Sequence, residues 1–511
     1  MSAVSFAQAQ SPFILVIDIG TSSLRAMVYD GKAREVENFR ARRKYQPDSS
    51  DDGGSTLDPR AMFDAFTDAL DEIVRECELA SSKFEFAAVA ASSLASNVLA
   101  LDAQGEPLTP AFLYADTRNS HAVEQLQAAY DWQPIYARTG CPLHTAYLPA
   151  RFLWLRETQP EIFARAAHYL GLHEFFLSKL FGNTAVSLSF AAWTGMLNHT
   201  SCDWDEQALN ISGIHRTQLS QLFAANESLR GLRAEYAARW KMLADVPWYP
   251  AFGDGAVANV GSGCVDETRV AVTVGTSGAM RVVMDANAGL DKLPRGLWMY
   301  RVDEEAGLLG GSLTDGGSIF QYFANLLQLT KGEILESELE RMPPDAHGLT
   351  LLPFFAGERS PGYHSDARAA LIGWRLSTSA ADLWRAALEA VAYRFAAIYD
   401  LLRTAVPEPR AIIASGAALL NSRVWCQNLA DVLGVAVTAS GEDEASARGA
   451  ALLALRSLAV ISSFNELPAS LGETFKPNPT TREIYQRARK RQESLYHLLL
   501  ESEKYHVQSP K

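Results

Sequence analysis

The sequence lacks the features of several large protein classes. Its five cysteines are scattered along 511 residues and include no Cys-x-x-Cys pair, which argues against a disulfide framework and against a zinc site. No stretch approaches the roughly 20 apolar residues that span a bilayer. Residues 1–12 also lack the basic start and apolar run of a secretory signal. We therefore expect a cytoplasmic protein with reduced thiols and no membrane partner.

Basic sequence is also scarce. Lysine and arginine total 46 against 59 acidic residues, which gives a net charge of −13, and the longest basic stretch is residues 40–44. Because nucleic-acid binding usually needs a basic patch, we expect no nucleic-acid partner. The composition, with 48% hydrophobic and 21% charged residues, is typical of a globular protein. The length exceeds that of one ordinary core and indicates two large domains.

One pattern occurs twice, about half a chain apart. Residues 13–19 form a strand-like run that ends in Gly-Thr-Ser at 20–22, and a second strand-like run follows. Residues 269–274 are likewise followed by Gly-Thr-Ser at 275–277 and another apolar run. The spacing of 255 positions is far longer than a solenoid repeat and favours two similar domains. Gly-Thr-Ser is also a common turn sequence, so this pattern alone leaves chance open.

Between these landmarks, predicted strands alternate with helical patterns, which favours α/β layers. The glycine-rich stretch at 261–266 is the best domain boundary. We therefore predict an α/β protein with a first domain over residues 12–263, a second over 267–460 and a helical tail over 461–511.

The two Gly-Thr-Ser turns are candidate phosphate sites. Asp18 directly precedes the first turn, so backbone N–H groups and hydroxyls can bind an anion while the carboxylate holds magnesium. The second turn follows Val274 and offers no such acid. Facing one another across a cleft, the turns would clamp a polyphosphate, although each alone is also a plausible structural turn. Neither matches the Walker pattern, and no Gly-x-Gly-x-x-Gly follows the strands.

Three other segments can carry chemistry, and each has a plainer interpretation. Asp254 lies between two glycines; at a cleft it can accept a hydroxyl proton during phosphoryl transfer, but such a residue is most often part of a turn. Asp116 and Arg118 can orient sugar hydroxyls or form a solvated ion pair. Residues 414–417 can support a flat heterocycle or form an ordinary strand-to-helix turn.

Taken together and in this order, the motifs resemble those of the FGGY carbohydrate kinases over residues 13–455. The matching stretches are Asp-Ile-Gly-Thr-Ser-Ser-Leu-Arg at 18–25, Gly-Asp-Gly-Ala-Val-Ala-Asn-Val-Gly at 253–261, Val-Gly-Thr-Ser at 274–277, Thr-Asp-Gly-Gly-Ser-Ile-Phe-Gln at 314–321 and Ser-Gly-Ala-Ala-Leu-Leu-Asn at 415–421. The resemblance implies two ribonuclease-H-like domains of the actin/hexokinase type with a catalytic cleft between them. It also implies phosphoryl transfer from ATP, with Mg²⁺, to an alcohol group of a carbohydrate.

The resemblance further implies roles for single residues. Asp254 becomes the catalytic base, and Asp18 and Asp254 become magnesium ligands. The implied ATP and phosphate contacts are Gly20, Thr21, Ser22, Arg25, Gly275, Thr276, Gly317, Gln321, Gly416, Ala417 and Asn421. The implied sugar contacts are Ser96, Asn97, Asp116, Arg118, Asp254 and Gly255. Ala417 stands where the family usually has a second glycine.

The substrate is suggested by a branch of the family. Tyr-Ala-Asp-Thr-Arg at 114–118, Thr-Gly-Cys-Pro-Leu-His at 139–144 and Gly-Glu-Arg-Ser-Pro at 357–361 look most like gluconate kinases. Ser96, however, replaces a histidine that gluconate and xylulose kinases commonly have at the sugar. We expect conversion of gluconate to 6-phosphogluconate in carbohydrate catabolism. The alternatives are a kinase for a ketose or polyol such as xylulose, and a catalytically silent sugar or nucleotide sensor; a homodimer stays open.

Overall fold

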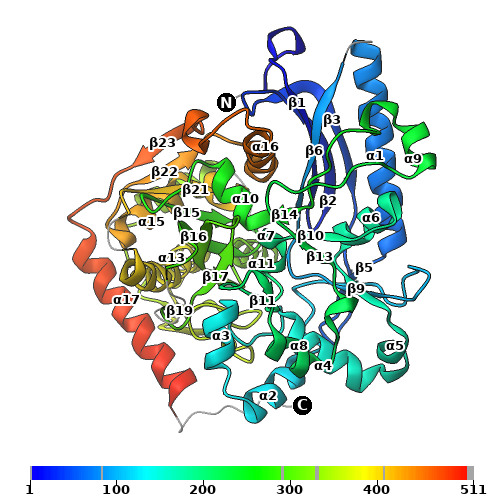
Figure 1. Cartoon of the computed structure of the whole chain (residues 1–511). Helices are drawn as coiled ribbons and strands as arrows, with labels where there is room; N and C mark the ends of the chain where they lie inside the picture. Colours follow the sequence, from blue (N-terminus) through cyan, green and yellow to red (C-terminus); the bar gives the residue numbers. More distant parts are fainter. Residues whose placement is uncertain (1–2, 82–83, 289–292, 328–332, 407–408, 503–511) are drawn as a thin grey trace.

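The computed structural model describes residues 3–81, 84–288, 293–327, 333–406 and 409–502. Two mixed β-sheets lie at the centres of two halves of the molecule, and helices cover their faces (Figure 1). Among the described helices, none combines the length and apolar character needed to cross a membrane. All five cysteines carry free thiols, and four of them are buried.

The first sheet has the strand order β3-β2-β1-β6-β14. Its strands are β1 (Phe13–Ile19), β2 (Ser23–Tyr29), β3 (Glu35–Lys44), β6 (Phe86–Ser93) and β14 (Phe252–Gly253). The first three strands pair antiparallel, whereas β6 runs parallel to both β1 and β14. The apolar run of β1 is buried on both faces, which explains why it lacks alternation. The predicted pair of strands around the first Gly-Thr-Ser turn is confirmed.

The second sheet repeats this arrangement. Its strands are β15 (Arg269–Val274), β16 (Gly278–Asp285), β17 (Trp298–Arg301), β18 (Ala306–Leu313), β21 (Ala411–Ser415), β22 (Val437–Ser440) and β23 (Leu471–Phe475). The inner order β18-β16-β15-β21-β22 has the same strand directions as the first sheet, and β17 and β23 extend its two edges. The sequence repeat therefore reflects two similar α/β domains, as predicted.

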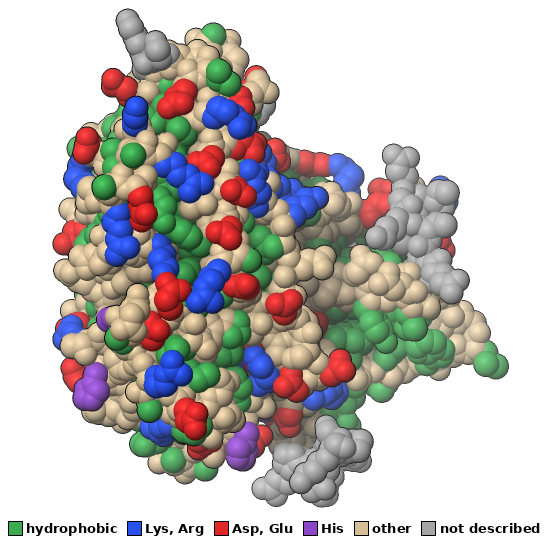
Figure 2. All heavy atoms as spheres, turned by 90° about the vertical axis from the view of Figure 1, so that its right-hand side faces the viewer, with side chains coloured by type: hydrophobic (Ala, Val, Ile, Leu, Met, Phe, Trp, Pro, Cys, Tyr) green, Lys and Arg blue, Asp and Glu red, His purple; other side chains and the backbone are tan. Residues whose placement is uncertain are grey.

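Amphipathic helices close the outer faces of the sheets. Helix α1 (Pro59–Ala80) begins at its cap Asp58 and buries an apolar stripe that includes Phe66 and Leu70 against the first sheet. Helices α13 (Ala380–Ala405) and α15 (Arg423–Leu433) contribute to the core of the second sheet. On the face shown in Figure 2, acidic and basic side chains are interspersed.

Helix α16 (Ala445–Ser457) links the two halves. It follows β22 of the second sheet, yet its alanines and leucines share a core with the inner face of the first sheet. It crosses α10 (Asp254–Gly261) at two glycines, Gly261 and Gly449, where the helix backbones touch (Figure 1). The two domains are therefore joined through packed helices as well as by the chain itself.

The region predicted as a helical tail is mixed. Residues 471–475 form the edge strand β23, because they pair with the free edge of β22. Helix α17 (Arg482–Tyr496) follows, then a π-helical turn (His497–Glu501). The last part of the predicted tail, residues 503–511, lies outside the described residues.

Smaller elements fill the connections. Between β3 and β14 these are β4 (Asp48–Ser49), β5 (Ser55–Leu57), β7 (Leu99–Leu101), β8 (Ala111–Phe112), α2 (Ser120–Ala129), α3 (Gln133–Thr139), α4 (Leu148–Thr158), α5 (Pro160–Arg165), β9 (His168–Leu170), α6 (Leu172–Phe181), β10 (Ala185–Ser187), α7 (Leu188–Ala191), β11 (Leu197–Asn198), β12 (Asp203–Trp204), α8 (Glu206–Ser212), β13 (Gln221–Phe223) and α9 (Ala234–Arg239). In the second domain they are α11 (Ser318–Leu326), α12 (Glu333–Arg341), β19 (Thr350–Leu352), β20 (Ala370–Ile372) and α14 (Ala417–Leu420).

Candidate active site

A cavity of about 230 Å³ lies between the two domains. The first domain contributes Thr21, Ala95, Ser96, Tyr114, Trp193, Asp254, Gly255 and Ala258, and the second contributes Thr273, Ser277, Gly278, Ala279, Arg281, Ser312, Arg359 and Ser446. Both Gly-Thr-Ser turns and Asp254 therefore meet at one cavity, although they are far apart in the sequence. A polar cavity between domains is a common position for a small-molecule site.

Asp254 is the first residue of α10 and follows directly on β14. The glycines beside it are needed because the indole of Trp193 packs against them: a Cβ atom at Gly255 would lie 2.6 Å from the Trp193 ring. Trp193 in turn stacks on Tyr300 of the second domain, with ring centroids 3.9 Å apart. The Gly-Asp-Gly sequence is therefore a strand-to-helix junction held under an aromatic ring.

The electrostatic environment of Asp254 suits a proton acceptor. Burial raises the pKa of its carboxyl group to about 6, against the opposing effects of Arg281 and the Gly255 backbone N–H. That N–H donates to Oδ1 at 2.7 Å. Within the described part of the chain, Oδ2 has no hydrogen-bond donor. A carboxylate with a pKa near neutrality and one uncommitted oxygen can accept a proton from a hydroxyl group.

The two Gly-Thr-Ser turns are each closed by a hydrogen bond from the glycine. Gly20 N–H donates to the carbonyl oxygen of Ser23, three residues ahead, and Gly275 N–H donates to that of Ser277, two residues ahead; both distances are 3.0 Å. Thr21 and Ser277 line the cavity, and Ser22 and Thr276 are exposed. Among the described residues, none of these four hydroxyl groups makes a side-chain hydrogen bond. They are therefore available to a ligand with many acceptor oxygens, such as a polyphosphate.

Residues predicted to contact the nucleotide gather around the second turn. The Gly317 N–H donates to the Gly275 carbonyl oxygen at 2.8 Å, and Thr276 accepts from the backbone of the same segment. Gly416 has a φ of 90° and lies against Val274, where a Cβ atom would clash with the backbone. A Cβ atom at Gly317 would lie 2.6 Å from the Cβ of Ala418, one residue after Ala417. The two glycines thus let three segments approach closely.

Two other predicted nucleotide contacts lie at the surface of this region. Gln321 is exposed on α11, where its side-chain amide donates to Asn325 at 2.8 Å. Asn421 ends α14 and is also exposed. Each of these residues comes a few positions after a segment that converges on the second turn: Gln321 after residues 314–317, and Asn421 after residues 416–417.

Asp18 and Arg25 form part of a link between the domains. They face one another on the paired strands β1 and β2, and the Arg25 guanidinium donates to Asp18 and to Glu444, the cap of α16. Arg40 donates to the other oxygen of Glu444 at 2.7 Å. Burial raises the pKa of Asp18 despite the opposing effect of Arg25. Asp18 is near enough to Asp254 to raise the pKa of that residue also.

The predicted sugar contacts are only partly brought together. Ser96 and Gly255 line the cavity, and the Ser96 hydroxyl donates to the Trp193 carbonyl oxygen at 2.7 Å. Asn97 does not line it: its amide donates to Leu94 O at 2.6 Å and accepts from the backbone of Leu172 at 2.7 Å.

Asp116 and Arg118 lie outside the cavity, where the buried carboxylate of Asp116 pairs with the half-buried Arg118. Arg118 donates to Asp116 at 2.5 Å, and Arg151 from α4 donates to it at 2.9 Å. Burial raises the pKa of Asp116, but the two arginines outweigh it and hold the pKa below its usual value. Of the predicted sugar-binding segment at 114–118, it is Tyr114 that lines the cavity.

Several residues of the cavity have no site role predicted from the sequence, and three of them, Arg281, Arg359 and Trp193, matter most for its chemistry. Arg281 was noticed only as part of the repeat; it donates to the Gly255 carbonyl oxygen at 2.9 Å. Arg359 was noticed only as part of a motif. Trp193 belongs to no motif. The glycines on either side of Asp254 indicate that some group packs closely there, but they do not show which residue it is.

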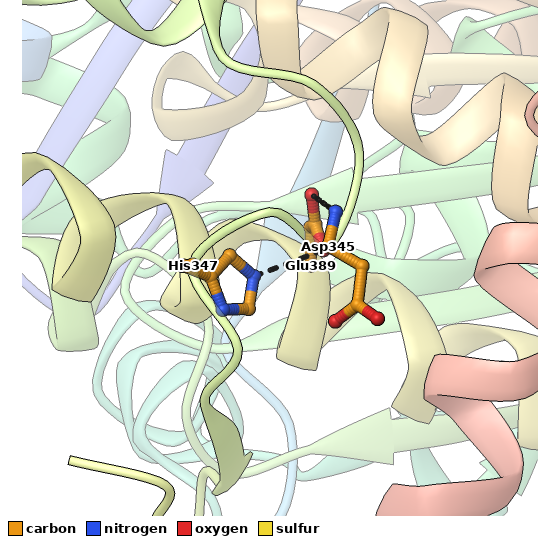
Figure 3. Close-up of side chains that lie close together, drawn as sticks. All are labelled: Asp345, His347 and Glu389. Atoms are coloured by element: carbon orange, nitrogen blue, oxygen red, sulfur yellow. Dashed lines mark hydrogen bonds and ion pairs between the residues drawn. The ribbon is translucent and has the colours of Figure 1, made fainter. Parts of the chain in front are cut away.

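A cluster of Asp345, His347 and Glu389 has the composition of a metal site but lies elsewhere in the second domain (Figure 3). His347 Nε2 lies 3.1 Å from Glu389, and Arg385 donates to the same carboxylate at 2.8 Å. Asp345 pairs with Arg491 at 2.6 Å. Burial raises the pKa of Glu389, but His347 and Arg385 hold it below its usual value. Arginines thus already supply the positive charge that a metal ion would bring.

Comparison with known proteins agrees with this geometry. Residues 13–261 match the model of the N-terminal domain of the FGGY family of carbohydrate kinases, and residues 270–458 match that of its C-terminal domain. The chain belongs to the FGGY family of carbohydrate kinases. Its two-domain FGGY fold and its activity class, phosphoryl transfer to a carbohydrate, follow from that membership.

Individual members resemble the chain along most of its length. A gluconokinase from Bacillus subtilis (strain 168) is 28% identical over 480 residues, which cover 91% of this chain and 92% of that one. The fold matches the crystal structure of gluconate kinase from Lactobacillus acidophilus with a TM-score of 0.86, at 24% identity and with 95% and 98% of the two chains covered. It matches the ligand-bound xylulose kinase from the same organism with a TM-score of 0.87, at 25% identity and with 96% and 99% covered.

Proposed function

We propose that this FGGY kinase transfers the terminal phosphoryl group of ATP to a hydroxyl group of gluconate, giving 6-phosphogluconate. The gluconokinase similarity and the motifs at 114–118, 139–144 and 357–361 support this substrate. A ketose such as xylulose is the second candidate. It is favoured by the similarity to a xylulose kinase. Ser96 lines the cavity in place of a histidine that both kinds of kinase commonly have, so it does not discriminate between the two sugars.

The observation that carries the proposal is Asp254. Its carboxylate lies in the interdomain cavity with a pKa raised to about 6 and one oxygen uncommitted. We assign to Asp254 the role of general base. Its carboxylate takes the proton of the sugar hydroxyl while the hydroxyl oxygen of the sugar attacks the terminal phosphorus atom of ATP, in line with the leaving ADP. The stacked ring of Trp193 holds the base in place, and closure of the domains around the cavity excludes water as a competing acceptor.

The phosphates of ATP fit the space between the two Gly-Thr-Ser turns. We assign the free hydroxyls of Thr21, Ser22 and Thr276 to their oxygens, with the second domain, over residues 267–460, carrying the nucleotide and the first, over 12–263, carrying the sugar. The oxygen donors of Asp18 and Asp254 have the hard character that Mg²⁺ prefers, and they lie in each other's electrostatic range. Bound there, Mg²⁺ would neutralise charge that develops on the phosphoryl oxygens.

The replacement Asp254→Asn tests this assignment. It keeps the shape of the side chain but removes the proton acceptor, so we expect kcat to fall by about 10²–10⁴-fold while ATP binding stays intact. In the wild type, kcat/KM should fall with unit slope below a pH of about 6, because Asp254 must be ionised to act. Asp64→Asn, at an exposed position of α1, is the matched control and should leave the rate unchanged.

The assay is ADP release with gluconate, xylulose and a panel of polyols. A rate for Asp254→Asn above about one tenth of the wild-type rate would show that Asp254 is not the base. Release of ADP with xylulose but not with gluconate would replace the first substrate by the second. ATP binding without ADP release for any sugar would instead indicate a silent sensor.

A further inference from the structure

The cavity contains an arginine, Arg359, that pairs with no other residue in the described part of the chain. Arg359 is half-buried and lines the cavity together with Asp254. Throughout the described ranges of the chain, no hydrogen bond or ion pair is made by its guanidinium group. Arg281, the other cavity arginine, differs in that it donates to Gly255 O and lies in the field of Asp254.

The loop around Arg359 is fixed on both sides. Glu358, which precedes it, pairs with Arg394 of α13 and accepts from the Tyr496 hydroxyl at 2.8 Å. Ser360, which follows it, is bound to Ser312 of β18: its N–H donates to Ser312 O at 2.9 Å, and its hydroxyl oxygen accepts from Ser312 N–H at 3.0 Å. The neighbours are thus tied to the scaffold, and the arginine between them is presented to the cavity.

The charges in the cavity do not balance. Of the residues that line it, one is acidic, Asp254, and two are basic, Arg281 and Arg359. Arginine stays protonated at all physiological pH values, so Arg359 keeps its positive charge in the cavity. A partly desolvated cation without a partner is costly unless a ligand supplies the opposite charge. This imbalance therefore favours an anionic substrate over a neutral one.

Arg359 lies close to the segment predicted to contact the sugar. The groups in its electrostatic range include Tyr114 of the segment 114–118, together with Tyr147, Tyr300 and Tyr363. His144, also nearby, is no second cation, because burial and Arg359 lower its pKa to about 3. Arg359 therefore lies among tyrosine rings, and a charged side chain within its electrostatic range, Arg281, is also a cation.

We propose that Arg359 binds the carboxylate of the substrate and so restricts this kinase to sugar acids. The inference rests on the proposed function and deepens it. A planar guanidinium can hold a carboxylate through two parallel hydrogen bonds, which no neutral hydroxyl can match. Because Arg359 belongs to the second domain and Asp254 to the first, a sugar acid held by both residues also ties the domains together around the substrate.

The test compares two acceptors that differ only at carbon 1: gluconate, which carries a carboxylate, and glucitol, which carries CH₂OH there. Wild-type enzyme should use gluconate far better. In Arg359→Gln, we expect kcat/KM for gluconate to fall about 10- to 100-fold through KM, the size expected for a lost charge-assisted pair. The value for glucitol and the KM for ATP should change less than about threefold. Arg359→Lys should recover part of the loss.

Arg368→Gln is the matched control, since Arg368 is exposed and its side chain donates only to backbone carbonyls of its own loop. A thermal denaturation curve with ATP present verifies that each variant is folded. An equal fall of kcat with both acceptors in Arg359→Gln, or a raised KM for ATP, would assign Arg359 to the phosphoryl group and overturn the inference. Wild-type enzyme that ignores gluconate but phosphorylates xylulose would overturn the proposed substrate itself, before any variant is measured.

Discussion

At the crossing of α10 and α16, replacing Gly449 with alanine should have two opposite effects on stability, one from helix propensity and one from packing. Replacing Gly449 with alanine in the middle of α16 should stabilise the helix by about 1 kcal/mol from intrinsic propensity alone. In the folded protein, however, the new Cβ atom would lie 1.9 Å from the carbonyl oxygen of Val257 in α10. Since Cβ atoms essentially never approach such an atom within 3.0 Å, the helices would have to separate by about 1 Å.

This separation should be costly because both partners are helix backbone, which cannot rotate aside as a side chain can. Overpacking a well-filled interior costs about 1–3 kcal/mol and occasionally more. We expect the upper end here, so Gly449→Ala should lose about 2 kcal/mol net after the helix-propensity gain. Activity should fall further, because α10 begins with Asp254 and Ser446 of α16 lines the cavity. A displacement of about 1 Å at a reacting centre can cost 10²-fold in rate.

Urea denaturation and kcat/KM for the sugar measure the two effects. Ala65→Gly, in the middle of α1, is the control that measures the propensity difference between alanine and glycine away from the crossing. If Gly449→Ala proved more stable than the wild type and equally active, the close contact of the two helices would not constrain the site, and the reasoning would be refuted.

Two further predictions concern buried charges. Asp254→Asn should raise the free energy of unfolding at pH 8 by up to about 3 kcal/mol, because folding raises the pKa from 3.8 to about 6 and the ionised form is the unfavourable one. This gain should vanish below pH 3.8, where the carboxyl group is protonated in both states; urea titrations at pH 8 and pH 3.5 compare them. Glu389→Gln should cost about 3–5 kcal/mol by leaving Arg385 buried without its counter-ion. EDTA, in contrast, should leave the wild-type melting temperature unchanged, and a lower temperature with EDTA would restore the metal interpretation of this cluster.

Local patterns were enough to predict most of the fold. The strand at 13–19 and the helices at 59 and 445 follow from apolar periodicity and from a cap such as Asp58, which act over a few residues. The repeat of the Gly-Thr-Ser turn predicted two similar domains. The placement of α16 on the first sheet could not be predicted, because its alanine-rich face would suit either core and its contact partner α10 lies far away along the chain.

The candidate site, too, was only partly predictable from local sequence. Asp254 and the two turns were found because glycines and small polar residues leave a local signal. Asp116 and Arg118 show where such a signal misleads: the same charged pair is consistent with a sugar site and with an ion pair, and the decision depends on Arg151, which is 33 or more positions away along the chain. Partners brought together only by the fold cannot be inferred from one segment.

The same limit explains why the unpaired arginine emerges only from the structure. In the sequence, Arg359 is one of 46 basic residues and stands directly after an acid, Glu358, which suggests an ion pair between neighbours. The fold separates them: Glu358 turns to Arg394, and Arg359 turns to the cavity. A charge without a partner can be recognised only when every candidate partner has been placed. Under the two proposals above, a base on one domain and an unpaired cation on the other limit the substrate to a molecule that carries both a hydroxyl group and a negative charge.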